Sequence, residues 1–366
     1  MEISSVEDWP FKATRPFIIS GPCSAETESQ VHYTARKLKK TGKVNLFRAG
    51  IWKPRTRPNS FEGVGEIGLQ WLVEAGKAQG LPTTTEVANA QHVELALKAG
   101  VDVLWVGART TVNPFSVQEI ADAVKGVDIP VIIKNPINPD LQLWIGAIER
   151  FALNGINKLM AMHRGFSSSL PSPYRNLPMW EIPIALKAEI PSIPILCDPS
   201  HICGNRHMLS GVAQKAMDLG MHGLMLESHP TPDEAWSDAK QQVTPEDFDT
   251  LLEQLQLRST ETSDPIIANK LHTLREEIDL IDQGILRLVA QRFGIIEQIG
   301  EYKKENDLTI LQLDRWKEIL QSRSELAKTL NIPDAFVSKY LEFMHKESIK
   351  AQSAIMNKGK EDELLW

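Results

Sequence analysis

The chain has 366 residues, of which 42% are hydrophobic and 24% are charged, and its formal net charge is −7. The apolar fraction excludes a chain that is disordered throughout, and the acidic balance leaves no overall basic field for nucleic acid or anionic lipid. No apolar run approaches the ~18 residues of a membrane helix, and three cysteines are too few for a disulfide framework, so we expect a cytoplasmic protein.

Short β-branched runs recur in the first two thirds of the chain, and each is followed by a polar turn and a stretch of helical character. We expect strands at residues 17–22, 45–50, 82–87, 103–108, 130–135, 156–164, 193–201 and 223–229. Eight such units predict an α/β domain with a closed (β/α)8 TIM barrel, because an open doubly wound sheet usually has five or six strands.

The rhythm changes after the barrel, which is predicted at residues 1–257. A polar stretch at 258–264 has no apolar residue and predicts a linker, and the remainder, 265–366, predicts a smaller all-α domain. Asp264 and Pro265 are the expected capping residue and first residue of its first helix.

That first helix carries one apolar stripe from Leu271 to Ile299, with a spacing of three and four residues. A stripe of this length requires a partner surface, so we expect a homodimer formed through the helical domain. Two shorter helices are predicted at 314–330 and 333–357.

Each predicted barrel strand has a titratable residue at or just beyond its end. These residues are Cys23, Arg48, Lys53, Arg55, Glu86, Arg109, Lys134, Arg164, His201 and Glu227. Barrel enzymes place their chemistry at the carboxyl ends of the strands. The basic members predict an anionic ligand, because converging cations destabilise one another unless phosphate or carboxylate neutralises them.

A thiolate, an imidazole and two carboxylates could together bind a metal: Cys23, His201, Glu227 and Asp238. This mixed set favours one divalent ion such as Mn²⁺, Fe²⁺, Co²⁺ or Zn²⁺ over Mg²⁺ or Ca²⁺, which prefer oxygen ligands alone. No close-spaced ligand signature accompanies them, and Cys23 taken alone reads more simply as a small buried hydrophobic residue.

Several strings at the strand ends resemble those of the 3-deoxy-D-arabino-heptulosonate 7-phosphate (DAHP) synthases of the shorter, type I-beta-like form. They are Gly-Pro-Cys-Ser at 21–24, Arg48 with Lys-Pro-Arg-Thr at 53–56, Gly-Ala-Arg at 107–109, Asp-Pro-Ser-His at 198–201, Leu-Glu-Ser-His-Pro at 226–230 and Ser-Asp at 237–238. The resemblance covers about residues 10–255 and implies a metal-dependent condensation of phosphoenolpyruvate with erythrose 4-phosphate, which opens the shikimate pathway.

The resemblance also implies roles for individual residues. Cys23, His201, Glu227 and Asp238 would be metal ligands; Arg48, Lys53, Arg109, Lys134 and Arg164 would hold phosphoenolpyruvate; Arg55 and Thr56 would contact the aldose phosphate. Glu86 is expected to orient the attacking water. Lys53, with a pKa expected to be lowered by neighbouring cations, is either a proton donor or a plain phosphate ligand.

Two other barrel chemistries compete with this interpretation. The octulosonate 8-phosphate synthases share the Gly-Pro-Cys opening, but they carry Lys-Ala-Asn-Arg-Ser where this chain has Lys-Pro-Arg-Thr. A Schiff-base aldolase with Lys134 as nucleophile would leave the four candidate metal ligands unexplained.

The helical domain resembles the all-helical chorismate mutases over about residues 268–355, which implies rearrangement of chorismate to prephenate. By this resemblance Arg275 of a partner subunit and Arg292 would hold the carboxylates, Arg315 and Ser348 would assist, and Lys303 and Gln352 would face the ether oxygen. Two positions depart from the pattern, because Gln312 stands where an aspartate is common and Trp316 where a glutamate is common.

An alternative for this domain is a helical dimerisation module that senses prephenate without turning over chorismate. Lys303 and Gln352 favour catalysis, because a sensor has no need of groups facing the ether oxygen. The two roles are compatible, and prephenate or chorismate bound to the helices could alter the rate of the barrel.

Overall fold

The computed structural model describes residues 2–11, 13–53, 61–169, 171–259 and 262–357. The chain divides into two compact units, Met1–Thr260 and Glu261–Trp366, and each has its own hydrophobic core. Within the described ranges, no helix combines the length and apolar composition that crossing a membrane requires.

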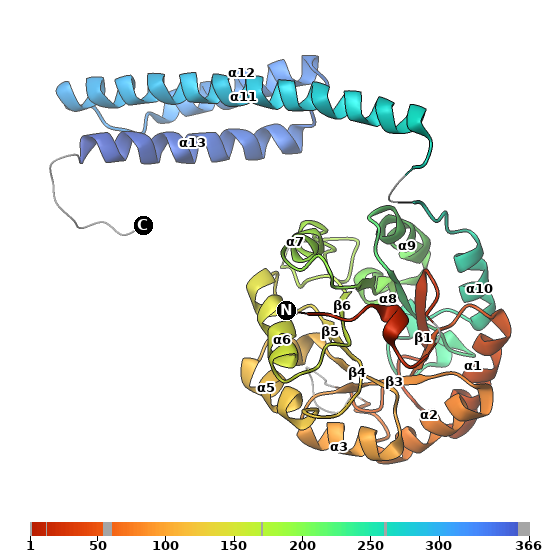
Figure 1. Cartoon of the computed structure of the whole chain (residues 1–366). Helices are drawn as coiled ribbons and strands as arrows, with labels where there is room; N and C mark the ends of the chain where they lie inside the picture. Colours follow the sequence, from red (N-terminus) through yellow and green to blue (C-terminus); the bar gives the residue numbers. More distant parts are fainter. Residues whose placement is uncertain (1, 12, 54–60, 170, 260–261, 358–366) are drawn as a thin grey trace. The chain divides into compact units, whose positions relative to one another are not determined.

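The first unit is a closed barrel of parallel strands that follow one another around the barrel in chain order (Figure 1). The strands are β1 (Phe17–Gly21), β2 (Leu46–Arg48), β3 (Thr83–Val87), β4 (Val103–Val106), β5 (Val131–Lys134), β6 (Leu159–His163), β7 (Ile195–Cys197) and β8 (Gly223–Glu227). Pairing of β1 with β8 closes the ring, and this confirms the predicted (β/α)8 architecture.

Helices surround the strands, as Figure 1 shows. They are α1 (Glu28–Thr41), α2 (Glu66–Gln79), α3 (Ala90–Ala99), α4 (Ala108–Thr111), α5 (Pro114–Ala123), α6 (Leu141–Leu153), α7 (Glu181–Glu189), α8 (Pro199–Cys203), α9 (Leu209–Asp218) and α10 (Pro245–Glu253). Strands such as β1, β4 and β5 are buried on both faces, which explains why they read in sequence as nearly continuous apolar runs; β3, with Thr83, Thr84 and Thr85, is the exception.

Side chains alternate between two cores along each strand. In β1, Phe17 and Ile19 pack inside the barrel, whereas Ile18 packs between the barrel and its helices. Val6 and Trp9 belong to the inner core, so the chain before β1 contributes to its packing. With apolar side chains filling the interior, polar side chains concentrate beyond the carboxyl ends of the strands.

The prediction for the seventh strand was too long. The strand ends at Cys197, and residues 199–203 form the short helix α8 instead of continuing to His201. Pro199 occupies the first turn of α8, and the Asp198 side chain accepts a hydrogen bond from the backbone N–H of His201. His201 therefore projects from a helix and not from a strand.

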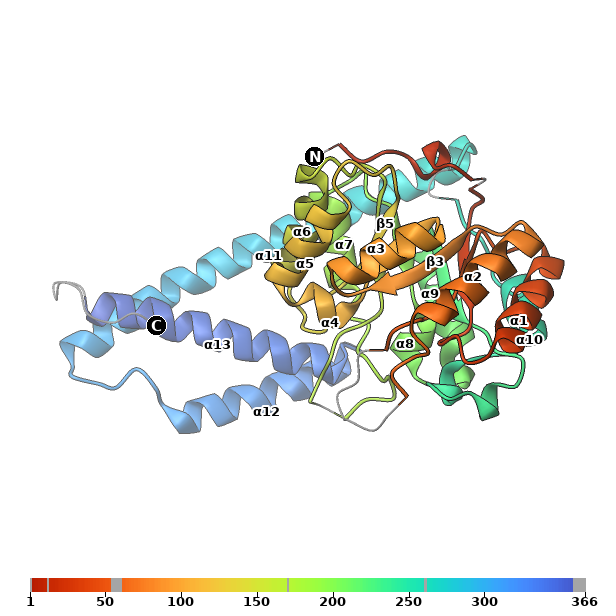
Figure 2. The same cartoon turned by 90° about the horizontal axis from the view of Figure 1, so that it is seen from below.

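The second unit consists of α11 (Pro265–Glu305), α12 (Leu313–Thr329) and α13 (Asp334–Met356), drawn in cyan and blue in Figure 2. The Asp264 carboxylate accepts hydrogen bonds from the backbone N–H groups of Ile266 and Ile267, so the predicted helix start is confirmed. Helix α13 packs against both α11 and α12. Much of the apolar stripe on α11 remains exposed, including Ile281 at 61%.

Candidate active sites

A cavity of about 230 Å³ lies at the carboxyl ends of the barrel strands. Its lining includes seven of the residues that the sequence singled out: Lys53, Glu86, Arg109, Lys134, Arg164, His201 and Asp238. Arg175, which the sequence analysis did not single out, also lines it. Arg55 and Thr56 lie outside the described residues, so the structure places neither of them.

Cys23, Glu227 and Asp238 form a compact cluster in which one possible ligand atom of each lies within 4.8 Å of the others. Cys23 Sγ lies 3.3 Å from Asp238 Oδ2 and 2.9 Å from Lys53 Nζ. His201 Nε2 lies 3.7 Å from Glu227 Oε1, so the imidazole borders the cluster. The structure thus brings together the four residues that the sequence proposed as metal ligands.

Arg48 lies beneath this cluster and is almost completely buried. Its Nη2 donates a hydrogen bond to the Cys23 carbonyl at 3.1 Å, and its Nη1 lies 3.3 Å from Glu227 Oε1. The guanidinium also stacks on the Trp105 ring, 4.8 Å from the ring centroid. Arg48 therefore supports the cluster from below and is not among the residues that line the cavity.

Asp198 was not assigned a role from the sequence, although it is buried at the end of β7. One of its carboxylate oxygens lies 2.8 Å from both His201 Nδ1 and Lys134 Nζ. Burial raises the pKa of Asp198, but His201 and Lys134 oppose it, so that the pKa lies well below its ordinary value. The charged carboxylate orients both side chains toward the cavity. Its place directly after a strand was the sequence signal for this role.

Arg175 and Gln241 hold the two carboxylates of the cluster. Arg175 Nη1 donates to Asp238 Oδ1 at 2.9 Å and to Gln241 Oε1 at 2.7 Å, and Gln241 Nε2 donates to Glu227 Oε2 at 2.7 Å. Arg175 lies between β6 and α7, far from any strand end in sequence. No strand-end rule could have selected it.

The pKa of Lys53, beside the cluster, differs from our expectation. Burial, together with Glu227, raises the pKa of the Cys23 thiol to about 12. The expected lowering of the Lys53 pKa is wrong. Burial does lower that pKa, but the acidic neighbours Cys23, Glu227 and Asp238 outweigh burial and raise it. The expectation failed because Lys53 faces the thiol–carboxylate cluster and not only other cations.

The remaining cations that line the cavity are Arg109 and Arg164. Burial lowers the pKa of Arg164 to about 10, and Arg164 Nη1 donates to Asn176 Oδ1 at 2.6 Å. Glu86 faces the same cavity, and its Oε2 accepts a hydrogen bond of 3.1 Å from Trp105 Nε1. Among the residues that the structure describes, five cationic side chains and two carboxylates line this cavity, so it is suited to an anion carrying phosphate and carboxylate groups.

The helical unit contains a larger cavity of about 660 Å³, and its polar lining includes Arg292 and Arg315. Arg292 Nη1 donates to Ser348 Oγ at 2.9 Å. Trp316 also lines the cavity and stacks on His345, with 4.0 Å between ring centroids. The cavity therefore combines guanidinium groups with an apolar and aromatic wall, a combination suited to a small dianion.

The other residues that the sequence analysis singled out in this unit differ in how far they are buried. Lys303 is buried and donates to the Ile310 carbonyl at 2.6 Å, and burial lowers its pKa. Gln352 is also buried, and its Oε1 makes no hydrogen bond to any described residue. Gln312 is the residue before α12, and Arg275 is exposed on α11. Within one chain, Arg275 is therefore not gathered with Arg292 and Ser348.

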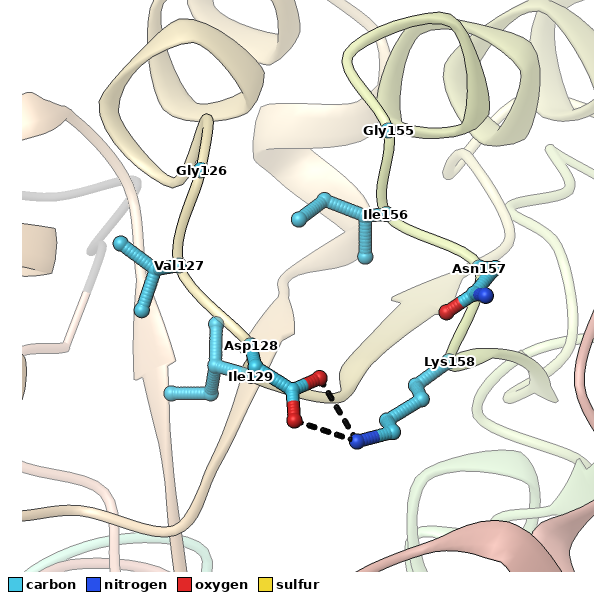
Figure 3. A pocket seen from close by; sticks show the side chains of 8 residues that line it. All are labelled: Gly126, Val127, Asp128, Ile129, Gly155, Ile156, Asn157 and Lys158. Carbon is cyan, nitrogen blue, oxygen red and sulfur yellow. Dashed lines mark hydrogen bonds and ion pairs between the residues drawn. The ribbon is translucent and has the colours of Figure 1, made fainter.

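A further hollow, of about 330 Å³, lies at the amino ends of β5 and β6 (Figure 3). Its charged lining consists of Asp128 and Lys158, whose carboxylate oxygens and Nζ are 2.6 and 2.7 Å apart. These two charges neutralise each other. This end of a TIM barrel normally serves stability and not catalysis.

Comparisons with known proteins give each unit a family. Residues 12–263 match the family model described as the DAHP synthetase I family, and residues 274–353 match chorismate mutase type II. A phospho-2-dehydro-3-deoxyheptonate aldolase of Thermotoga maritima is 32% identical over 238 residues, which is 65% of this chain and 68% of that protein. A 2-dehydro-3-deoxyphosphooctonate aldolase of Dechloromonas aromatica is 29% identical over 255 residues, 63% of this chain and 84% of that protein.

Solved structures agree with the barrel. The crystal structure of the Thermotoga maritima DAHP synthase matches with a TM-score of 0.61 and 28% identity, covering 69% of this chain and 72% of that chain. A truncated form of the Thermotoga maritima synthase matches with a TM-score of 0.58 and 27% identity, covering 69% of this chain and 90% of that chain.

Proposed function

The chain belongs to the DAHP synthetase I family and carries a chorismate mutase type II domain after its barrel, and from this premise we propose its two reactions. The barrel condenses phosphoenolpyruvate with erythrose 4-phosphate, and the helical domain converts chorismate to prephenate. The chain is thus a bifunctional transferase and isomerase of aromatic biosynthesis. The observation that carries the first reaction is a cavity whose lining combines several cations with Asp238, a member of the cluster that Cys23 and Glu227 complete.

A divalent metal ion fits the cluster. Cys23, Glu227 and Asp238 supply donor atoms of a suitable type and separation, and His201 borders them. The buried Oε1 of Glu227 makes no hydrogen bond to the described residues, and its ion pair with Arg48 Nη1 at 3.3 Å leaves it a lone pair for a metal ion. When bound, such an ion would polarise the aldehyde oxygen of the aldose as a Lewis acid.

The cations of the cavity bind phosphoenolpyruvate in this proposal. Arg109, Lys134 and Arg164 hold its phosphate and carboxylate, and Arg48 supports the floor of the site. Asp198 keeps Lys134 in place through the contact at 2.8 Å. The bound anion neutralises the positive charge of these side chains and so stabilises their close approach. The same contacts orient the enol carbon of phosphoenolpyruvate for attack.

Lys53 and Glu86 are the side chains that transfer a proton and orient water in this proposal. Lys53, which stays protonated because its pKa is raised, donates a proton from Nζ to the former aldehyde oxygen while the new carbon–carbon bond forms; its alternative role is that of a plain phosphate ligand. Glu86, held by Trp105, orients the water that adds to the phosphate-bearing carbon and stabilises positive charge there. Collapse of the resulting adduct releases inorganic phosphate.

Phosphate release tests this reaction. The protein is supplied with phosphoenolpyruvate, erythrose 4-phosphate and a divalent ion, and phosphate is followed with and without chelator. We expect a rate that the chelator abolishes and that Cys23→Ser lowers by roughly tenfold or more. A chelator-insensitive rate would contradict the metal centre while leaving the condensation intact.

The octulosonate aldolase relative makes a five-carbon aldose phosphate the second candidate substrate. The Lys-Pro-Arg-Thr string at 53–56 and the family match favour the four-carbon substrate. Assays with arabinose 5-phosphate in place of erythrose 4-phosphate separate the two. Faster phosphate release with arabinose 5-phosphate would reverse our assignment.

In the helical domain, Arg292 and Arg315 bind the carboxylates of chorismate with help from Ser348. Lys303 and Gln352 stabilise negative charge on the ether oxygen as its bond to carbon breaks. Gln352 would do so by donating from Nε2, and its buried Oε1 makes no hydrogen bond to the described residues. A prephenate-sensing domain without catalysis remains the alternative.

Arg292→Ala distinguishes these alternatives. We expect it to abolish prephenate formation from chorismate while phosphate release by the barrel persists, because Arg292 lies in the helical unit. If the wild-type chain binds prephenate but forms none from chorismate, the domain is a sensor. Loss of both reactions in the variant would indicate unfolding.

We also propose a homodimer. A single helical unit buries few apolar side chains, and α11 exposes Ile278, Ile281 and Ile285 at 56%, 61% and 49%. A second copy of the helix would cover this stripe and would bring the partner's Arg275 toward the cavity.

A further inference from the structure

The loop that joins β8 to α10, residues 228–244, carries Asp238, and it is tied to the segment after β1 that carries Cys23. Glu26 and His229 form the buried part of this tie, with exposures of 5% and 4%. His229 Nε2 lies 3.3 Å from Glu26 Oε2. Neither residue lines the cavity, so neither can contact a substrate there.

The hydrogen bonds define the roles of both side chains. The backbone N–H of Thr231 donates to His229 Nδ1 at 3.1 Å, so Nε2 carries the ring proton and donates it to Glu26 Oε2. Glu26 Oε1 accepts a hydrogen bond of 2.8 Å from the backbone N–H of Trp236. One carboxylate therefore holds both ends of residues 229–236.

Further hydrogen bonds connect this loop to the two candidate metal ligands, Cys23 and Asp238. The Cys23 backbone N–H donates to Gln242 Oε1 at 3.0 Å, and Gln242 Nε2 donates to the Ser237 carbonyl at 2.9 Å. Ser24 Oγ and Ser237 Oγ are also hydrogen-bonded. Asp238 follows at once with a φ of 50°, in the left-handed region, which costs free energy in a residue other than glycine although aspartate tolerates it better than most.

We propose that Glu26 and His229 are positioning residues that fix the loop so that the Asp238 carboxylate faces Cys23, and that they thereby set the affinity of the site for a divalent metal ion. The inference rests on the metal centre under the proposed function. A loop freed from Glu26 would relax at Asp238, because that residue holds an unfavourable backbone conformation. Removing such supporting contacts typically weakens metal binding about 10- to 100-fold.

Binding of Mn²⁺ to the full-length protein, measured by electron paramagnetic resonance of the free ion, tests the proposal without any turnover. Glu26→Gln changes one acceptor atom into a donor, so one orientation of the amide opposes His229 Nε2–H and the other opposes the Trp236 N–H. We expect the dissociation constant to rise about tenfold or more. Glu246→Gln, in the exposed ion pair with Lys37, is the matched control and should leave it unchanged.

Two replacements of His229 distinguish the effect of its hydrogen bond to Glu26 from the effect of losing the bulk of its ring. Gln places its amide near the former Nε2 and can still donate to Glu26, whereas Asn reaches only the Nδ1 contact with Thr231. We expect His229→Asn to weaken Mn²⁺ binding about tenfold or more and His229→Gln to retain most of it. Thermal melting by circular dichroism identifies any variant that has lost its fold. If His229→Asn has unfolded, the smaller change Glu26→Gln alone provides the test.

The outcomes distinguish this inference from its premise. If the wild-type protein binds no Mn²⁺, the proposed metal centre is wrong and the positioning role falls with it. If the wild type binds Mn²⁺ and the folded Glu26→Gln and His229→Asn variants bind it equally well, the metal centre stands and only the positioning role is overturned.

Discussion

Gly107 shows how one absent side chain shapes the barrel site. A Cβ at this position would collide with the Glu86 carboxylate, so glycine leaves the space in which Glu86 reaches Trp105. The Gly107 backbone has a negative φ, so its conformation does not require glycine. The space for Glu86 is therefore the reason that glycine is needed here.

Gly107→Ala should displace Glu86 and lower the rate of phosphate release on the order of tenfold to a hundredfold, since small misplacements of catalytic groups are costly. Gly146→Ala is the control, because nothing lies within 4 Å of a Cβ at that helical position. Equal rates for the two variants would remove Glu86 from our mechanism.

His163 makes the stability of the barrel sensitive to acid. Burial, with help from Arg164, lowers its pKa from 6.5 to about 3, and its ring packs beside Phe166 and Trp180. Between those two values the unfolded chain binds a proton that the folded chain excludes. The contribution of His163 to stability is therefore complete above about pH 6.5 and is lost as the pH falls.

We expect the free energy of unfolding to fall by about 1.4 kcal/mol per pH unit below pH 6.5 on account of this residue. His163→Leu should make that dependence shallower by the same amount, whereas the exposed His207→Leu should not. Urea unfolding between about pH 7 and pH 5 measures both slopes. An unchanged slope for His163→Leu would show that the imidazole is protonated when folded.

At the scale of elements, the strand pattern predicted the fold well because strands buried on both faces leave continuous apolar runs. The start of α11 was predictable because an Asp-Pro pair supplies a cap and a fixed φ locally. The end of β7 was missed although Asp198 and Pro199 supply the same local signal, because the predicted strand was extended through this pair to His201.

Some residues of the barrel site could likewise be predicted from the sequence and others could not. Residues at strand ends, such as Cys23 and Glu227, could be predicted because topology alone brings strand ends together. Arg175 and Gln241 could not, because they reach the cluster from long connections whose course is set by tertiary contacts. The raised pKa of Lys53 was missed for a related reason, since the sequence does not say which charges face it.

The stripe on α11 predicts a measurable oligomer. Ile281→Glu places a charge in the middle of the exposed apolar surface, so we expect it to convert the dimer to a monomer in light scattering after size-exclusion chromatography. Asp279→Ala, an exposed residue off the stripe, should leave the mass unchanged. A wild-type mass equal to one chain would contradict the proposed dimer.

For the whole molecule, each of the two units has its own core and its own cavity among the described residues. We predict that their presence in one chain serves regulation, because prephenate is formed or bound by the helices while the barrel supplies its precursors. Such coupling requires that the ligand bind two states of the chain with different affinity.

Cutting the chain within residues 258–264 tests that coupling. A protease site inserted there gives intact and cleaved protein of identical composition, so that any difference arises from the connection alone. We expect the separated barrel to release phosphate at the basal rate, because its cavity lies within Met1–Thr260. We also expect prephenate to slow the intact chain and to have no effect on the barrel purified away from the helices, since coupling free energy disappears with the second site. Identical prephenate responses of the intact chain and the separated barrel would place the regulatory ligand in the barrel itself.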